Sequence, residues 1–376
     1  MNNTNNINHT NHFDDTSAAC VMNIRGGRRF RGVAAVLLCA ALIVGVAGCG
    51  NRSGEEDAIS AGVDKQEYNA VVDIEEGNKN IYVILKSFND YWQVVQTGAA
   101  QAGEDIGCNV YVGGSLTEAG WMAQQELIEE AMAAEADGIV IAADDSVKLS
   151  AVVSKAYQSG IPTVLIDTGV NTEDYDVVFM TDNLLAGGMA AEEMLNQLRQ
   201  KGVGEEEEVQ IAIQVGVSSS QTINERLAGF SQYWTKHAPE GWNILTEVKC
   251  NDGEVEKAKE CARDFFDEYP SIDGVFGTNN GSTMGFAHVV RERGLKDVVV
   301  VGYDFSEEIG ALIASEDYWA ATVLQRQYEM GYQGVVAAMR LGDGESVDKK
   351  FINTGVVIVN KDTLDDPQVQ VILEQN

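Results

Sequence analysis

Short apolar runs alternate with longer amphipathic stretches from residue 80 onward, and this rhythm constrains the fold more than any other feature. The run 81–85 reads Ile-Tyr-Val-Ile-Leu and predicts a strand. In the stretch 92–106 that follows, apolar residues recur at helical spacing, namely Val95, Ala99, Ala102 and Ile106. The alternation predicts further strands at 109–112, 138–142 and 162–166 and helices at 121–135 and 148–158. Strands joined through helices run parallel, so we expect a parallel sheet with helices on both faces.

The alternation restarts in the second half of the chain. It predicts strands at 209–215, 244–248, 274–277 and 298–301 and helices at 184–200, 222–237, 255–266 and 284–293. The predicted fold class is therefore α/β, with two doubly wound parallel-sheet domains in series. The last part adds a strand at 320–324, a helix at 328–341 and a strand at 355–359. We expect these additional elements to cross between the domains and to form a hinge.

The first 48 residues differ from the rest and predict a secretory signal. Four arginines lie between positions 25 and 31, and an uncharged apolar run follows at 33–48. That run is shorter than the about 20 residues that a membrane-spanning helix needs. Its end, Val46-Ala47-Gly48-Cys49, resembles the lipobox of bacterial lipoproteins, which implies cleavage before Cys49 and lipid attachment to that cysteine. An uncleaved anchor or a plain signal peptide is the alternative, and Met22 is an alternative start.

Residues 49–79 are rich in Gly, Asp, Glu, Asn and Ser, and we expect them to form a flexible tether. The leader holds four arginines and two aspartates, so the chain's 26 basic and 58 acidic residues fall to 22 and 56 after cleavage. The resulting net charge of −34 argues against nucleic acid as a partner, because nucleic-acid affinity depends on Lys and Arg at the phosphates.

The sequence contains none of the common catalytic or nucleotide-binding motifs considered below. There is no GxSxG elbow, no P-loop and no GxGxxG between a strand and a helix. No Cys/His spacing indicates zinc, so neither a metal nor a cofactor is expected. Cys108, Cys250 and Cys261 remain beyond the leader, and this odd number is no disulfide framework. Cys250 and Cys261 either pair or remain thiols. We therefore predict a protein that is not an enzyme.

Polar and aromatic residues cluster where the predicted strands end, which is where open α/β sheets bind their ligands. An aromatic ring stacks on the apolar face of a sugar, and Asp, Asn, Gln and Arg form paired hydrogen bonds with its hydroxyls. This chemistry predicts a sugar-like ligand, and each residue has a structural alternative as a helix cap, a turn or a core residue. The candidate ligand-binding residues are Lys86, Asn89, Tyr91, Trp92, Asp167, Arg226, Asn279, Asp304 and Gln325.

These residues stand in motifs that resemble the periplasmic sugar-binding proteins of the ribose-binding type, which share their fold with LacI-type repressor cores. The resemblance spans about 80–359. The motifs that carry it are Lys86-Ser87-Phe88-Asn89-Asp90-Tyr91-Trp92, Asp167, Asn224-Glu225-Arg226-Leu227-Ala228-Gly229-Phe230, Asn279, Val301-Gly302-Tyr303-Asp304 and Ala320-Ala321-Thr322-Val323-Leu324-Gln325. It implies that the candidate residues contact a sugar and that Gln325 serves both ligand and hinge.

The sequence departs from the ribose binders at three places. Thr168 stands where those proteins carry an arginine, a cleft aromatic is missing near Asp252-Gly253, and Lys86 adds a cation. These departures argue against ribose itself. Lys86 either meets a carboxylated sugar or pairs with a cleft aspartate, and the sequence does not decide between the two.

The resemblance also implies closure of two domains on the ligand and delivery to an ABC permease by a monomeric protein anchored to the membrane through Cys49. The crossings would lie near Thr181-Asp182, Gln325-Arg326 and Thr354-Gly355. An extracellular sensor that presents the sugar to a receptor kinase is the alternative; the leader argues against a LacI-type regulator, and the missing catalytic set against a secreted hydrolase. The expected domains are 1–48 signal peptide, 49–79 tether, 80–181 plus 326–354 N-terminal domain and 182–325 plus 355–376 C-terminal domain.

Overall fold

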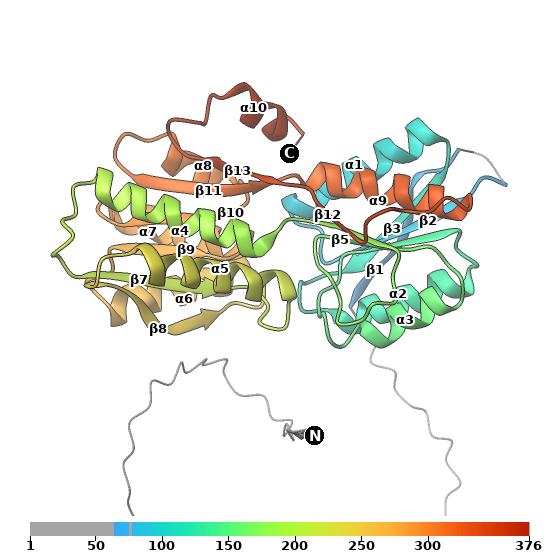
Figure 1. The fold of residues 1–376 in the computed structure, drawn as a ribbon, viewed down its shortest axis with the longest axis horizontal. Coiled ribbons are helices and arrows are strands. Elements are labelled where there is room, and N and C mark those ends of the chain that lie inside the picture. The colour runs from blue at the N-terminus through green and yellow to red at the C-terminus, as the bar shows by residue number, and fades with distance from the viewer. Residues whose placement is uncertain (1–63, 75–76, 376) are drawn as a thin grey trace, which may run out of the picture.

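The computed structural model describes residues 64–74 and 77–375, which form two α/β lobes side by side (Figure 1). The predicted signal, Cys49 and most of the predicted tether lie outside the described residues. The first lobe has one seven-stranded sheet in the order β1-β3-β2-β4-β5-β6-β12. Its strands are β1 (Lys65–Val72), β2 (Asn80–Leu85), β3 (Asn109–Ser115), β4 (Gly138–Ile141), β5 (Thr163–Ile166), β6 (Val177–Met180) and β12 (Phe351–Asn353).

Helices cover both faces of this first sheet. One face packs against α1 (Asp90–Ile106) and α9 (Gln327–Gly342), and the other against α2 (Trp121–Ala133) and α3 (Ser150–Gln158). Every residue of β4 and β5 is buried, which explains why these strands are apolar without alternation.

The second lobe repeats this plan with a six-stranded sheet in the order β13-β11-β10-β9-β7-β8. Its strands are β7 (Val209–Val215), β8 (Trp242–Cys250), β9 (Gly274–Gly277), β10 (Val299–Tyr303), β11 (Trp319–Gln325) and β13 (Val356–Val359). The helices on one face are α4 (Asn183–Gln200) and α5 (Gln221–His237). Those on the other face are α6 (Val255–Glu268), α7 (Asn280–Arg293), α8 (Glu307–Ile313) and α10 (Pro367–Leu373). The predicted α/β class with two doubly wound sheets is confirmed, and one antiparallel edge strand completes each sheet.

The chain passes between the sheets at three places, after β6, after β11 and between β12 and β13. Gln325 ends β11 in the second sheet, and α9 starts two residues later on the first. Thr354 and Gly355 separate β12 from β13, and Gly355 has a φ of +80°, a left-handed conformation that glycine adopts without strain.

Strand β1 corrects the prediction of a flexible tether over 49–79. Lys65–Val72 pairs antiparallel with β3, the Tyr68 hydroxyl donates to the Leu127 carbonyl at 2.9 Å, and Val72 is buried. The strand gave no apolar pattern in the sequence, because an edge strand is held mainly by backbone hydrogen bonds and its side chains can be polar. None of the helices within 64–74 and 77–375 combines the length and the hydropathy that crossing a membrane requires.

Two helix pairs, α1 with α9 and α4 with α5, meet through glycines at backbone distance. A Cβ added to Gly187 of α4 would lie 2.2 Å from the Arg226 carbonyl oxygen of α5. The helix–helix contact therefore holds the backbone of Arg226 in place and tolerates no side chain at position 187.

Gly187→Ala is expected to lower the free energy of unfolding by about 1–3 kcal/mol, because the new methyl group forces α4 and α5 apart. The matched control is Gly188→Ala, where the nearest atom to an added Cβ is 3.8 Å away. That variant should be neutral or up to about 1 kcal/mol more stable, since alanine favours the helix. Urea denaturation of both variants tests the contact, and equal effects at the two positions would contradict it.

Candidate functional site

A cavity lies between the two lobes, where the carboxyl ends of their strands face each other. The structure brings together all but one of the predicted ligand-binding residues in its wall, namely Lys86, Tyr91, Trp92, Asp167, Arg226, Asn279, Asp304 and Gln325. Asn89 is the exception, because its side chain caps α1 by accepting from the Trp92 amide and donates to Glu118 at 3.4 Å. Which of these side chains contact a ligand stays a prediction.

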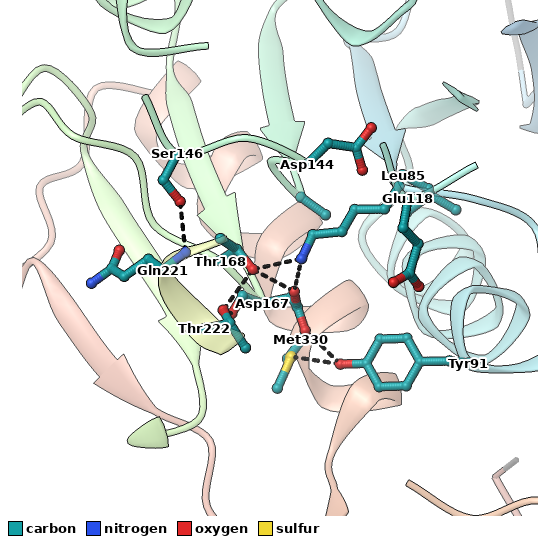
Figure 2. Close-up of polar contacts among 12 residues, drawn as sticks. Leu85, Tyr91, Glu118, Asp144, Ser146, Asp167, Thr168, Gln221, Thr222 and Met330 are labelled. Carbon is teal, nitrogen blue, oxygen red and sulfur yellow. Dashed lines mark hydrogen bonds and ion pairs between the residues drawn. The ribbon is translucent and has the colours of Figure 1, made fainter. Parts of the chain in front are cut away.

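Asp167 is the most heavily bonded carboxylate of the cavity. It follows β5, is 4 % exposed and accepts from Lys86 Nζ at 2.7 Å and from the Tyr91 hydroxyl at 2.8 Å (Figure 2). Thr168 donates to the same carboxylate at 2.7 Å. Burial raises the pKa of Asp167, but the charges of Lys86 and Arg226 and these hydrogen bonds outweigh burial and hold the pKa below its usual value. The carboxylate is therefore ionised at neutral pH.

Lys86 is placed by this network. Of the two alternatives left by the sequence, the structure shows the ion pair with a cleft aspartate, and Lys86 also donates to Thr168 Oγ1 at 2.6 Å. Lys86 is 7 % exposed, and its ammonium lies 5.6 Å from the centre of the Trp92 ring. The Lys86 ammonium is therefore already engaged in an ion pair and a hydrogen bond within the protein.

Arg226 is the counterpart in the second lobe, and α5 places it in the cavity wall. The guanidinium donates to the side chains of Asn183 and Gln325 and to the Thr278 carbonyl, each at 2.8 Å. Its central carbon lies 3.9 Å from the centre of the Tyr303 ring, which adds a cation–π contact. Arg226 is 2 % exposed, so these contacts fix its orientation.

Asp304 follows β10 as Asp167 follows β5, and both aspartates have left-handed backbones, with φ of +66° and +61°. Such a conformation is strained for a residue other than glycine and is typical of functional sites. Gln325 donates to Asp304 Oδ1 at 2.8 Å and accepts from the Thr181 hydroxyl at 2.9 Å, so it links the cavity to two crossings. Burial raises the pKa of Asp304 to about 6, although the Arg226 charge and the Gln325 hydrogen bond act against this rise.

The two aromatics after β2 pack edge to face, with ring centres 4.8 Å apart. Trp92 is 2 % exposed and donates from Nε1 to Glu118 at 3.0 Å, so it belongs to the core as well as to the cavity wall. Asn279 caps α7 by accepting from the Ser282 amide at 3.2 Å, yet it also lines the cavity. Trp92 is therefore a core residue as well as a cavity residue. Asn279 caps a helix and also lines the cavity, where the sequence alternative was a turn.

The cavity contains residues that the sequence analysis did not select, among them Glu118, Asp144, Thr222 and Asn280. Asp144 could have been found, because it comes three residues after β4 ends at Ile141, at the same sheet edge. Glu118 gave no such signal, since it lies inside the loop between β3 and α2.

The lobes touch across the cavity in the structure. Thr168 Oγ1 and Thr222 Oγ1 are 2.6 Å apart, and the Gln221 amide donates to Ser146 Oγ at 3.1 Å (Figure 2). A Cβ added to Gly253 would lie 2.8 Å from the Glu118 Cβ, so the missing side chain permits a close approach. These contacts hold the two lobes against each other across the cavity in this structure.

Within the part of the chain that the structure describes, no group of three or more His, Cys, Asp and Glu side chains could hold a metal ion. The Cys250 thiol donates to the Gly216 carbonyl at 2.8 Å, and the Cys261 sulfur lies 3.9 Å from the Cys250 carbonyl oxygen. Both contacts are those of thiols with the backbone.

Comparison with known proteins gives a consistent family. Residues 81–346 match the model of the periplasmic binding protein domain. The ribose import binding protein RbsB of Escherichia coli is 26 % identical over 213 residues, which cover 57 % of this chain and 68 % of that protein. The D-apiose import binding protein of Actinobacillus succinogenes is 25 % identical over 268 residues, covering 71 % and 79 %.

Among solved structures, a carbohydrate transporter solute-binding protein of Agrobacterium radiobacter in complex with D-arabinose superposes with a TM-score of 0.75 at 27 % identity. The match covers 79 % of this chain and 99 % of that one. Because the family model spans most of the described fold and the cavity lies where the two sheets meet, the chain belongs to the periplasmic binding protein family, whose members bind solutes and are not enzymes.

Proposed function

We propose that this protein captures a sugar or sugar-like molecule between its two lobes and delivers it to an ABC permease. The observation that carries the proposal is the buried cavity, in which two aspartates, an arginine and a glutamine face Tyr91 and Trp92. Carboxylates accept from sugar hydroxyls, the guanidinium and the amide donate, and the face of an aromatic ring stacks on the apolar face of the sugar. The relatives that carry names of sugar binding proteins support the same ligand class.

Capture works by hinge closure in this proposal. The first lobe, 80–181 plus 326–354 together with strand β1, and the second lobe, 182–325 plus 355–376, rotate about the three crossings. The ligand shifts the equilibrium because only the closed form surrounds it. The ligand-binding side chains are those predicted from the sequence, with Asn89 acting through Trp92 and Glu118.

The protein acts outside the cytoplasm as a monomer, anchored by lipid on Cys49 after removal of the leader 1–48. The lipobox resemblance Val46-Ala47-Gly48-Cys49 and the names of the import relatives support this location. Radiolabelled fatty acid should be incorporated into the protein in cells and should be absent from Cys49→Ser. Labelling of that variant would contradict the anchor.

A thermal-shift screen of the purified protein tests the ligand class. The panel holds pentoses, hexoses, amino sugars, sugar acids, inositols and nucleosides. A ligand present at 100 times its dissociation constant adds about 2.7 kcal/mol of stability. We expect a shift with one sugar class, lost in Asp304→Ala, and loss of uptake of that sugar when the gene is deleted. Unchanged uptake would favour a sensor, and no shift by any sugar would contradict sugar capture.

The raised pKa of Asp304 predicts that sugar affinity depends on pH. The ionised carboxylate accepts hydrogen bonds from ligand hydroxyls, so affinity should fall by up to about tenfold per unit as the pH drops below about 6. Calorimetric titrations between pH 5 and 8 measure this loss. Asp304→Asn should bind more weakly at pH 7.5 and lack this dependence, and a wild-type affinity that stays flat down to pH 5 would contradict it.

Asp304 affects the stability of the ligand-free protein in the opposite direction: stability falls as the pH rises, whereas sugar affinity increases. The pKa of Asp304 in the folded protein is raised to about 6, above the about 3.9 of an unfolded chain. The folded state therefore holds its proton longer, and ligand-free stability decreases as the pH rises from about 4 to about 6. Relative to Asp304→Asn, the wild type should lose about 3 kcal/mol over this interval, a difference that denaturation at several pH values measures.

A further inference from the structure

The cavity wall holds more acidic than basic side chains. Four carboxyl side chains, Glu118, Asp144, Asp167 and Asp304, face two cationic side chains, Lys86 and Arg226. Lys86 is paired with Asp167, and the three hydrogen bonds that Arg226 donates go to uncharged oxygen atoms. Among the described residues, three of the four carboxyl groups therefore have no ion-pair partner within 4.0 Å.

Asp144 is the carboxyl group of the cavity that has a buried oxygen atom without a hydrogen-bond partner. It is 1 % exposed, and its Oδ2 accepts from Ser115 Oγ at 2.8 Å. Its Oδ1 is buried and has no hydrogen-bond partner among the described residues, although Asp144 lines the cavity. A buried acceptor left unsatisfied costs free energy, so this oxygen is suited to a donor that arrives with the ligand.

The neighbours of Asp144 favour a positively charged donor over a neutral one. In Figure 2, Asp144 and Glu118 lie on the side of Asp167 away from Gln221. Burial raises the pKa of Asp144 well above its usual value. The Lys86 charge and hydrogen bonding from Ser115 and the Gly120 backbone only partly offset this, and the Glu118 charge raises the pKa further. A protonated amine would give the unpartnered Oδ1 a donor and would favour the ionised form of Asp144. It offers up to three donors, needs no acceptor and brings a positive charge.

We propose that the Asp144 end of the cavity is a subsite for a protonated amine, with Asp144 Oδ1 and Glu118 as its acceptors, so that the preferred ligand is a sugar carrying a basic amino group. This inference rests on the proposed function of sugar capture and names its ligand class. It also disfavours sugar acids, because a further anion would meet the carboxyl groups while both cations are already bonded.

Isothermal titration of the purified protein with matched ligands tests the subsite. The ligands are glucose and galactose, their 2-amino and 6-amino derivatives, and the N-acetylated forms that keep the position and remove the charge. Wild type should bind at least one amino sugar about tenfold or more tightly than its parent and its acetylated form, since a charge-assisted hydrogen bond is roughly twice as strong as a neutral one.

Asp144→Asn keeps the shape and removes the charge, and it should reduce this preference to about threefold or less. The matched control is Asp145→Asn, because Asp145 is the next residue, is 5 % exposed and accepts from the Val147 and Lys148 amides without lining the cavity. It should retain the preference. Melting curves show that both variants are folded before titration.

The outcomes separate the two proposals. Neutral sugars that bind as tightly as their amino forms, or a preference that Asp144→Asn retains, would overturn the amine subsite and leave sugar capture standing. Binding of no sugar at all would overturn sugar capture and the subsite with it. A preference lost in both Asp144→Asn and Asp145→Asn would assign the effect to the loop after β4 and would also overturn the subsite.

Discussion

Arg226→Leu is expected to abolish sugar binding and to lower the free energy of unfolding by about 2 kcal/mol or more. The variant leaves two buried oxygen atoms, on Asn183 and Thr278, without their donor, while the Gln325 oxygen keeps only the Thr181 hydroxyl. Each buried acceptor that loses its partner costs about 1 kcal/mol or more. Chemical denaturation and calorimetric titration with the sugar found in the screen measure the two effects.

Arg263→Leu is the control for this variant. Arg263 sits on the outer face of α6 and donates to Glu292 at 3.1 Å, with more than a third of its side chain exposed. Its removal should cost no more than about 1 kcal/mol and leave binding intact. Comparable losses at the two positions would mean that the Arg226 network contributes nothing beyond an ordinary surface arginine.

Lys86→Met is expected to lower the free energy of unfolding by about 3–5 kcal/mol, because it leaves the Asp167 carboxylate buried without its cation. The double variant Lys86→Met/Asp167→Asn should recover most of this loss, since no unpaired charge remains. Lys296→Met removes an exposed ion pair with Asp317 and should cost about 1 kcal/mol or less.

The pH dependence gives this prediction a second signature. The folded pKa of Asp167 lies below its unfolded value, so the ion pair stabilises the protein at neutral pH and loses its effect as the pH falls through the folded pKa. The difference between wild type and Lys86→Met should therefore shrink in acid. A constant difference from pH 7 to pH 3 would show that lost packing, and not charge, causes the destabilisation.

The sequence predicts the α/β fold well because its interior strands are short and wholly buried. A run such as Val298-Val299-Val300-Val301 is apolar on both faces of the sheet, and no other location suits it. Strand β1 was not predicted because its polar residues are typical of a linker. Its backbone hydrogen bonds go to β3, and at least 37 residues separate each pair of bonded positions in the chain. Such backbone pairing leaves no local pattern.

Much of the cavity wall was predictable for a related reason, since the carboxyl ends of parallel strands lie at one edge of a sheet. What the sequence could not supply is the pairing of side chains far apart in the chain. Lys86 and Asp167 are separated by 81 positions, and only the folded sheet shows that they form an ion pair. Glu118 was missed because a loop residue belongs to no strand end.

The contacts between Thr168 and Thr222 and between Ser146 and Gln221 form without a sugar. They therefore affect how much of the ligand-free protein is closed. Every bond that the lobes form with each other raises the share of empty molecules that are shut. Under the proposed function, a closed, empty molecule would compete with loaded molecules for the permease and deliver no ligand. In this proposal, stronger contacts between the lobes favour tight closure on the ligand but also increase the fraction of empty, closed protein that reaches the permease.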